Sequence, residues 1–353
     1  MRPGPSTEVL KGVVAVGARI DVHLGRTVVA LDVPCEDVQI DWASDRIVPG
    51  KLTYTCPSGW VPESPAAALN NYGQRSHVLM VLETPTGRDS VDLGWWQHQT
   101  WEEDASGKVK VEALDLMQLL EQDPMAWPSS PPSGATVLTE AQRLAGALPV
   151  VLDPGTPNPL VSPSTQWGHS RSEAIRDLCV ARGLNWAVKA DGQLHLWKQT
   201  DAREPVARYT GRDLLVEAPR KSVDRRPNRW VSVGSPQQED DKKPAVRWTG
   251  TALNTSWPYE PSMYGWVTDR REFNAASSAA AVRQAANTSM LTALSAASKR
   301  SLEIVPDPRL EVGDVIAVHT DADEIIVGKI VAYSLPVDKP GGLMRVDVEE
   351  LAW

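Results

Sequence analysis

Short runs of β-branched and apolar residues, each ended by a turn signal, constrain the fold of this chain more than any other feature. Such runs are typical of β-strands joined by tight turns. They lie at 13–16, 27–33, 78–82, 91–101 and 109–113, and again between 302 and 349. We therefore expect a mainly β protein in which both ends of the chain are β structure.

The two β regions share a spacing of strands and turns. Val81 stands 13 residues before Gly94, and Val315 stands 13 residues before Gly328. In each region another glycine follows and leads into an alternating strand that ends in Glu. This echo predicts two copies of one β-barrel, one at each end of the chain.

The segments between the β regions have helical periodicity and Pro-rich boundaries. Residues 124–134 contain four prolines and mark a boundary, and a short helix capped by Thr139 is expected after it. The pattern over 170–197 predicts a helix followed by two alternating strands around an Asp-Gly turn. Apolar residues at i+4 spacing predict a long helix over 277–299.

At 353 residues the chain exceeds the size at which one hydrophobic core stops growing. The expected fold class is mainly β with α+β modules, in which two tube-like β-barrels flank small helix-plus-hairpin domains. The expected domains are a first tube-like barrel (1–120), a small helical or linker module (121–165), a helix-plus-hairpin module (166–222) and a second tube-like barrel with a long helix and an extended loop (223–353). The aromatic-rich loop 235–264 receives no role.

Charge and targeting signals restrict the partners of the chain. The formal net charge is −9, whereas proteins that grip nucleic acid carry a Lys/Arg excess. The start of the chain lacks the pattern of a signal peptide, and no apolar run approaches the ~20 residues of a membrane helix. We expect synthesis in the cytoplasm, no membrane partner and no stable grip on DNA.

No residue pattern points to catalysis or to a bound cofactor. The segment 168–172 resembles a nucleophile elbow, but Ser172 stands where the second Gly belongs. The carboxylates at 102–104 and 321–324 fall at expected turns, and Cys35, Cys56 and Cys179 lack metal-ligand spacing. We expect free buried thiols, no catalytic residue, no metal, no cofactor and no enzymatic activity.

A tryptophan cluster is the most distinctive local feature. Alternation along a strand places Trp95 and Trp101 on one face and Trp96 on the other. Exposed tryptophans stack on sugars or mark interfaces, whereas buried ones fill a core. We favour core and subunit-contact roles for the three, which makes them candidate interface aromatics.

One motif in the last third of the chain carries a family resemblance. The strand 228–234 is followed by a polar insertion, an Ala-rich helix and the segment 305–316. These elements, in this order, resemble the baseplate-hub, or tail-hub (minor tail), proteins of long-tailed bacteriophages. In that family a "P-x-L-x-x-G-D-x-V" turn leads into the last barrel. The chain supplies Pro308, Leu310, Gly313 and Asp314 for this turn, and Val315 stands one place before the position of the motif's final Val. We expect Gly313 to adopt a positive φ there.

The resemblance implies a structural protein of the virion. Members of this family form a ring, usually trimeric, in which two barrels per subunit make a six-barrel collar between a sixfold tail tube and threefold tip proteins. The implied partners are other copies of the chain, tail-tube (distal tail) proteins, the tape-measure protein, tip or fibre proteins, and DNA in transit during ejection. Two alternatives remain open: a receptor- or carbohydrate-binding tail protein that uses the regions of Trp95 and Trp257, and a tail-associated cell-wall hydrolase.

Overall fold

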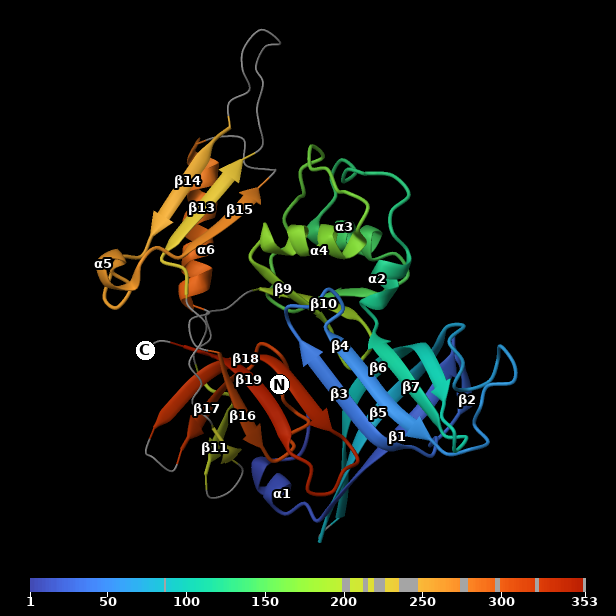
Figure 1. The fold of residues 1–353 in the computed structure, drawn as a ribbon. Coiled ribbons are helices and arrows are strands. Elements are labelled where there is room, and N and C mark those ends of the chain that lie inside the picture. Colours follow the sequence, from blue (N-terminus) through green and yellow to red (C-terminus); the bar gives the residue numbers. More distant parts are fainter. Residues whose placement is uncertain are drawn as a thin grey trace.

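The large sheet at the base of the molecule and two smaller units above it make up the fold (Figure 1). The computed structural model describes residues 1–85, 87–198, 204–211, 215–218, 226–234, 247–273, 279–295, 299–320 and 324–351. Over these residues the chain forms a 13-stranded sheet, two three-stranded sheets and six helices. None of these helices has the length and apolar character needed to span a bilayer. The expected mainly β class is confirmed.

The N-terminal β unit is an antiparallel sheet with the spatial order β3-β4-β7-β6-β5-β1-β2. Helix α1 (Thr7–Lys11) precedes its strands, which are β1 (Ala15–Leu24), β2 (Thr27–Ala30), β3 (Glu36–Ala43), β4 (Gly50–Cys56), β5 (Gln74–Thr84), β6 (Gly87–Glu103) and β7 (Val109–Asp115). Alternate residues of β4, β5 and β7 are buried. Because buried and more exposed side chains alternate, one face of the sheet points toward the core.

The C-terminal β unit continues the same sheet in the order β12-β16-β19-β18. Its strands are β11 (Ala207–Thr210), β12 (Leu215–Glu217), β16 (Lys299–Ile304), β17 (Val315–His319), β18 (Ile325–Pro336) and β19 (Met344–Glu350). Strand β17 lies between β18 and the parallel strand β11. The ends of the chain therefore both contribute to β structure, as expected.

The two β units are joined by strand β18, which has three neighbours. Its first half pairs with β17, most of its length pairs with β19, and its last residues pair with β3, from Ala332 opposite Ala43 to Pro336 opposite Gln39. One buried cluster includes Ile40 of β3 and Leu335 of β18. Over the described residues neither unit closes into a barrel, so tube-like closure stays a prediction.

The echo in the sequence corresponds to a repeated strand arrangement. Strands β5-β6-β7 and β17-β18-β19 are both antiparallel meanders, with Gly94 opposite Val78 and Gly328 opposite Ile316. The two glycines meet different needs. Gly94 has φ +91°, whereas a Cβ atom on Gly328 would lie 2.9 Å from Cβ of Val348.

The middle unit contains helices packed on a small sheet. Its elements are α2 (Gln118–Gln122), α3 (Val137–Ala145), β8 (Val150–Leu152), α4 (Arg171–Val180), β9 (Leu184–Val188) and β10 (Leu194–Lys198). Leu144, Ile175 and Leu196 belong to one buried cluster, so segments 121–165 and 166–222 share a core. The expected cap Thr139 is wrong, because Thr136 caps α3 and Thr139 completes the capping box from the third helical position.

The third unit stands apart from the middle unit in Figure 1 and has its own small core. It contains β13 (Arg229–Gly234), β14 (Thr249–Leu253), α5 (Pro261–Tyr264), β15 (Thr268–Phe273) and α6 (Ala279–Ser295). The long helix expected at 277–299 is confirmed over Ala279–Ser295 as α6, whereas Lys299 already belongs to β16. Helix α6 packs so closely on β14 that a Cβ atom on Gly250 would lie 2.5 Å from the carbonyl oxygen of Val282. Residues 235–246, which include the polar insertion, lie outside the described residues.

We predict that Gly328→Ala lowers the free energy of unfolding by about 1–3 kcal/mol, because its added methyl group overpacks the contact with Val348. Gly17→Ala in β1 is the matched control, since no atom lies within 4 Å of the Cβ it would gain. Urea unfolding of both variants measures the difference. Equal stability of the two variants would contradict the close packing of β18 on β19.

Candidate functional site

Backbone hydrogen bonds join strand β18 to the turn that leads into the last strands. Leu310 is fully buried in the main core. The Gly313 amide donates to the carbonyl of Ile330 at 2.8 Å, and the Ile330 amide donates to the carbonyl of Asp314 at 2.8 Å. Gly313 has φ +96°, which confirms the expected conformation. The turn therefore fixes where β17 starts against β18.

A buried ion pair inside this turn was not found from the sequence. The guanidinium of Arg309 donates to both carboxylate oxygens of Asp307, at 2.9 and 2.8 Å, and the two side chains are 6% and 2% exposed. The Tyr209 hydroxyl also donates to Asp307, at 2.7 Å. Burial, reinforced by the nearby carboxylate, raises the pKa of Tyr209, so its hydroxyl remains a donor. Arg309 occupies a variable position of the motif, which explains why the motif gave no signal for it.

The first residues of the chain form an arm across the same turn. The amide of Arg2 donates to the carbonyl of Arg309 at 2.6 Å. Its guanidinium donates to the carbonyls of Leu310 at 2.9 Å and Pro308 at 3.2 Å, and to the Tyr333 hydroxyl at 3.1 Å. Pro308 is itself buried, and its carbonyl accepts from the Arg2 guanidinium. These contacts join residues more than 300 positions apart, so no local pattern could predict them.

Asp314 ends the turn as a partly buried acceptor. One carboxylate oxygen accepts from the amino group of Met1 at 2.7 Å, and the other accepts from the amide of Glu311 at 2.8 Å. Burial raises the pKa of this carboxyl, against the opposing effect of the amino group. The four motif residues thus form one structural turn, and their role in a hub stays a prediction.

The three tryptophans of β6 lie in two different environments. Trp96 is 1% exposed and packs edge-to-face on Trp42, with ring centroids 5.8 Å apart. Trp101 also packs on the main core, whereas Trp95 packs on the core of the middle unit and stacks on His77 at 4.5 Å. Their use as interface aromatics is untested and stays a prediction.

The prediction that Trp95 and Trp101 share a face is wrong. A β-bulge between His98 and Thr100 inserts one residue into β6, opposite a regular stretch of β7. The insertion reverses the alternation, so Trp101 returns to the face of Trp96. Trp95 instead meets the hairpin of the middle unit, where a Cβ atom on Gly192 would lie 3.0 Å from its ring.

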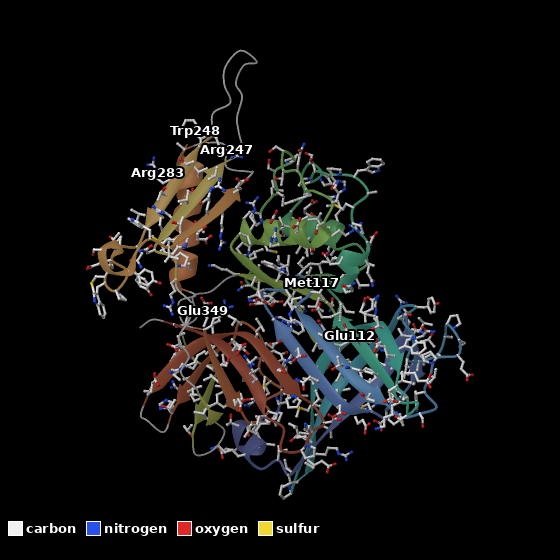
Figure 2. The ribbon with its side chains drawn as sticks, viewed as in Figure 1. Glu112, Met117, Arg247, Trp248, Arg283 and Glu349 are labelled. Carbon is white, nitrogen blue, oxygen red and sulfur yellow. The ribbon has the colours of Figure 1, made fainter. Side chains whose placement is uncertain are left out.

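A cleft of about 680 Å³ lies where the middle unit meets both β units. Aromatic and charged side chains of both signs line it, including Trp42, Arg46, Arg176, Trp186, Trp197 and Glu349. Figure 2 shows Met117, another lining residue, at the junction between the middle unit and the large sheet. The mixture of charges gives the cleft no preference for one class of ligand.

The third unit presents an ordered loop with exposed apolar side chains, which we call the tip loop (residues 254–266). Asn228 is fully buried, and its amide group donates to the carbonyls of Tyr259 at 3.0 Å and Gly265 at 2.9 Å. Trp257 and Met263 are each 78% exposed on this loop. Figure 2 shows Arg247, Trp248 and Arg283 at the opposite end of the unit.

The candidate catalytic pattern at 168–172 has structural roles. Ser170 caps α4, and its hydroxyl accepts from the amide of Glu173 at 3.2 Å. A ring nitrogen of His169 lies 3.2 Å from the carbonyl oxygen of Met125, and the Ser172 hydroxyl donates to Glu121. These contacts use the polar atoms that a nucleophile and its base would need.

The other residues considered for chemistry also lie in structural settings. Asp104 accepts from the amides of Ser106 and Lys108 in an exposed turn. Residues 321 and 323 lie outside the described residues. Cys56 and Cys179 are buried and Cys35 is half-buried, and all three are free thiols. Among the described residues, no cluster of three or more His, Cys, Asp or Glu side chains is placed to hold a metal ion.

Asp115, at the end of β7, is a buried carboxyl with an altered titration. Its oxygens accept from the amides of Gly50 at 2.5 Å and Met117 at 2.7 Å. Burial raises its pKa to about 7, although both amide donors act in the opposite direction. A raised pKa can mark a catalytic acid, but both oxygens here are engaged in holding the chain between the β unit and the middle unit.

The fold of this chain is similar to that of several solved tail proteins. The chain is similar to a tail protein of Neisseria meningitidis (TM-score 0.62, 14% identity), with 95% of this chain and 97% of that chain covered. It is also similar to the 43 kDa tail protein of prophage MuSo2 from Shewanella oneidensis (TM-score 0.62, 11% identity, 94% and 98% covered). A third is prophage tail protein gp18 of Listeria monocytogenes (TM-score 0.52, 10% identity, 95% and 94% covered). The sequence matches no protein-family model and no curated protein.

We predict that Gly313→Val lowers the free energy of unfolding by about 1 kcal/mol or more, because a β-branched residue resists the positive φ of this turn. Space is not the obstacle, since the nearest atom to an added Cβ is Cε of Lys329 at 3.9 Å. Gly17→Val is the control, because no atom lies within 4 Å of its added Cβ and Gly17 lies in the extended strand β1. Unchanged melting of the Gly313 variant would argue against a strained turn.

We predict that stability decreases at this site as the pH rises through about 7. The folded-state pKa of Asp115 is raised to about 7, above its unfolded value of about 4. The contribution is therefore fully present below about pH 4 and is lost as the pH rises through the folded-state pKa. Asp115→Asn should flatten the dependence between about pH 4 and 7 in urea unfolding, and an unchanged slope would place the titration elsewhere.

Proposed function

We propose that this chain is a structural tail-hub protein of a phage tail tip. The observation that carries the proposal is a fold shared over nearly the whole length with prophage tail proteins. The meander repeated at the two ends of this chain also supports the proposal. In this role the chain joins the tail tube to the tip proteins and surrounds the channel through which DNA is ejected.

The proposed assembly is a ring of three copies. Each chain supplies two β units, so three chains supply six, which matches a sixfold tail tube. Over the described residues each unit is open in the single chain, and we propose that it takes the place of one tube-like barrel in the collar. The domain limits 1–120, 121–165, 166–222 and 223–353 belong to the same proposal.

The charge of the chain suits a channel through which DNA must slide. Three copies with a net charge of −9 each carry −27 in total. An acidic wall does not hold phosphates by counterion release, as a wall lined with Lys and Arg would. The proposed partners are the other two copies, tail-tube (distal tail) proteins, the tape-measure protein and tip or fibre proteins, with DNA only in transit and no membrane. The proposed location is the tail tip of the virion, after synthesis in the host cytoplasm.

We predict that density for the assembled tail tip contains three copies of this chain around an open channel. The first and last β units should line that channel, with the third unit and its tip loop directed outward. Cryo-electron microscopy of intact tails measures this arrangement directly. A chain located outside the central ring, or a ring whose two β units face away from the channel, would refute the hub proposal.

A receptor- or carbohydrate-binding role is the second candidate. The observation that favours it is Trp257, 78% exposed on an ordered loop, since such side chains stack on sugars. The Trp95 region supports it less, because that ring is stacked on His77. Glycan-array binding that is lost in Trp257→Ser and kept in Trp127→Ser, a change at a tryptophan 80% exposed elsewhere, would favour this candidate.

The proposal also holds that the chain is not an enzyme. The third alternative is a cell-wall hydrolase, and zymography on peptidoglycan tests it. Clearing that disappears in His169→Ala or Ser170→Ala would assign a hydrolase to the segment that caps α4. Clearing that survives both changes would assign it to other residues and would equally contradict a purely structural role.

A further inference from the structure

Two cysteines stand one position beyond the first residue pair of the β3–β4 ladder, Cys35 just before Glu36 and Cys56 just after Thr55. Glu36 is the register partner of Thr55, so the next position outward places Cys35 across from Cys56. The irregularity in this ladder lies on the other side of Glu36, toward Gln39, and does not separate the cysteines. Directly opposed residues of antiparallel strands have Cα atoms about 4.5–5.5 Å apart. Disulfides span Cα separations of about 4.4–6.8 Å.

Both side chains face the same core. Cys56 is fully buried in the main cluster, and Cys35 is half-buried and packs against that cluster. Burial raises the pKa of each thiol to about 12, and the charge of Cys35 raises that of Cys56 further. Cys179 lies in the core of the middle unit and is influenced by burial alone.

We propose that Cys35 and Cys56 form a cross-strand disulfide when the protein meets an oxidant. The bond is absent in this structure, in which both residues are free thiols. The site is therefore a modification site that switches between a dithiol and a disulfide. The register of β3 and β4 brings the pair together, so little backbone movement is needed.

The chemistry requires an acceptor for two electrons, and a small-molecule disulfide such as oxidised glutathione supplies it. Cys35, the more accessible residue, loses its proton and attacks one sulfur of that disulfide, which releases one glutathione thiolate. Cys56 then loses its proton and attacks the mixed disulfide at the sulfur of Cys35, which releases the second thiolate. The protein loses two protons and two electrons, and the two glutathione thiols gain them. High thiol pKa values make both steps slow at neutral pH and faster in mild alkali.

The bond would act on the strand that joins the two β units. It would fix the start of β3 to the end of β4 and close a loop of about 20 residues, which restricts the unfolded chain. The timing of this reaction rests on the proposed function, because a tail protein is assembled in a reducing cytoplasm and then released into an oxidising medium. The formation of the bond itself does not depend on that function.

The test is oxidation of the purified full chain with oxidised glutathione in mild alkali, followed by thiol titration in denaturant. The wild type should fall from three titratable thiols to one, and Cys179→Ser should fall from two to none. In the Cys35→Ser variant, Cys56 and Cys179 should not link to each other. Non-reducing peptide mapping should recover one linked pair, 35 with 56. The oxidised protein should melt several degrees higher, and a reductant should reverse the shift.

Three results would overturn the proposal. The first is a wild type that stays folded and keeps three thiols after prolonged oxidation. The second is a linked pair that contains Cys179, and the third is a product linked only between chains. Cys35→Ser is the chosen variant because Cys35 is half-buried, whereas Cys56 is buried. Tail-tip density that contradicts the hub leaves these results unaffected, so the two proposals fail separately.

Discussion

The pairing of β3 with β18 is the interaction on which the rest of the fold depends. Five consecutive residue pairs, from Ala332 with Ala43 to Pro336 with Gln39, turn two β units into one sheet. The core follows this pairing, because buried residues of both units belong to one cluster. Neither unit then presents a free edge at this position, which removes a site where unpaired backbone groups would recruit other chains. The middle and third units stand on a base that this pairing makes continuous.

Buried polar contacts fix the geometry of that base where the chain has no regular structure. Asp307 holds Arg309 and Tyr209 in a site from which water is largely excluded, and Arg2 closes it from the other end of the chain. A buried ion pair of this kind adds little net stability, but leaving one partner alone costs about 3–5 kcal/mol. The network therefore contributes mainly to the specificity of the fold and little to its net stability. It allows one placement of the turn against β18 and disfavours the alternatives.

The sequence predicted local elements well and their long-range pairing poorly. Strand β17 and the helix α6 follow from apolar spacing, and Gly313 follows from its turn motif. Strands β3 and β4 were not predicted. Val38-Gln39-Ile40 alternates, but in β3 a bulge and the positive φ of Asp37 interrupt the start of the pattern. The bulge in β6 reversed the face of Trp101 for a similar reason. The contacts of Arg2 with Leu310 and of β3 with β18 depend on tertiary packing, which no local period encodes.

The separation of β3 and β18 along the chain has a consequence for biosynthesis. Ile40 and its partner Leu335 are 295 positions apart, so a ribosome that adds about 5–20 residues per second needs roughly 15–60 s to deliver the second after the first. During this interval the N-terminal β unit has emerged with the outer edge of β3 unpaired. An open strand edge is a template for other nascent chains, and several ribosomes on one message hold such chains close together. The rate of translation, and the chaperones that meet the chain in that interval, therefore bear on how much of it reaches the folded state.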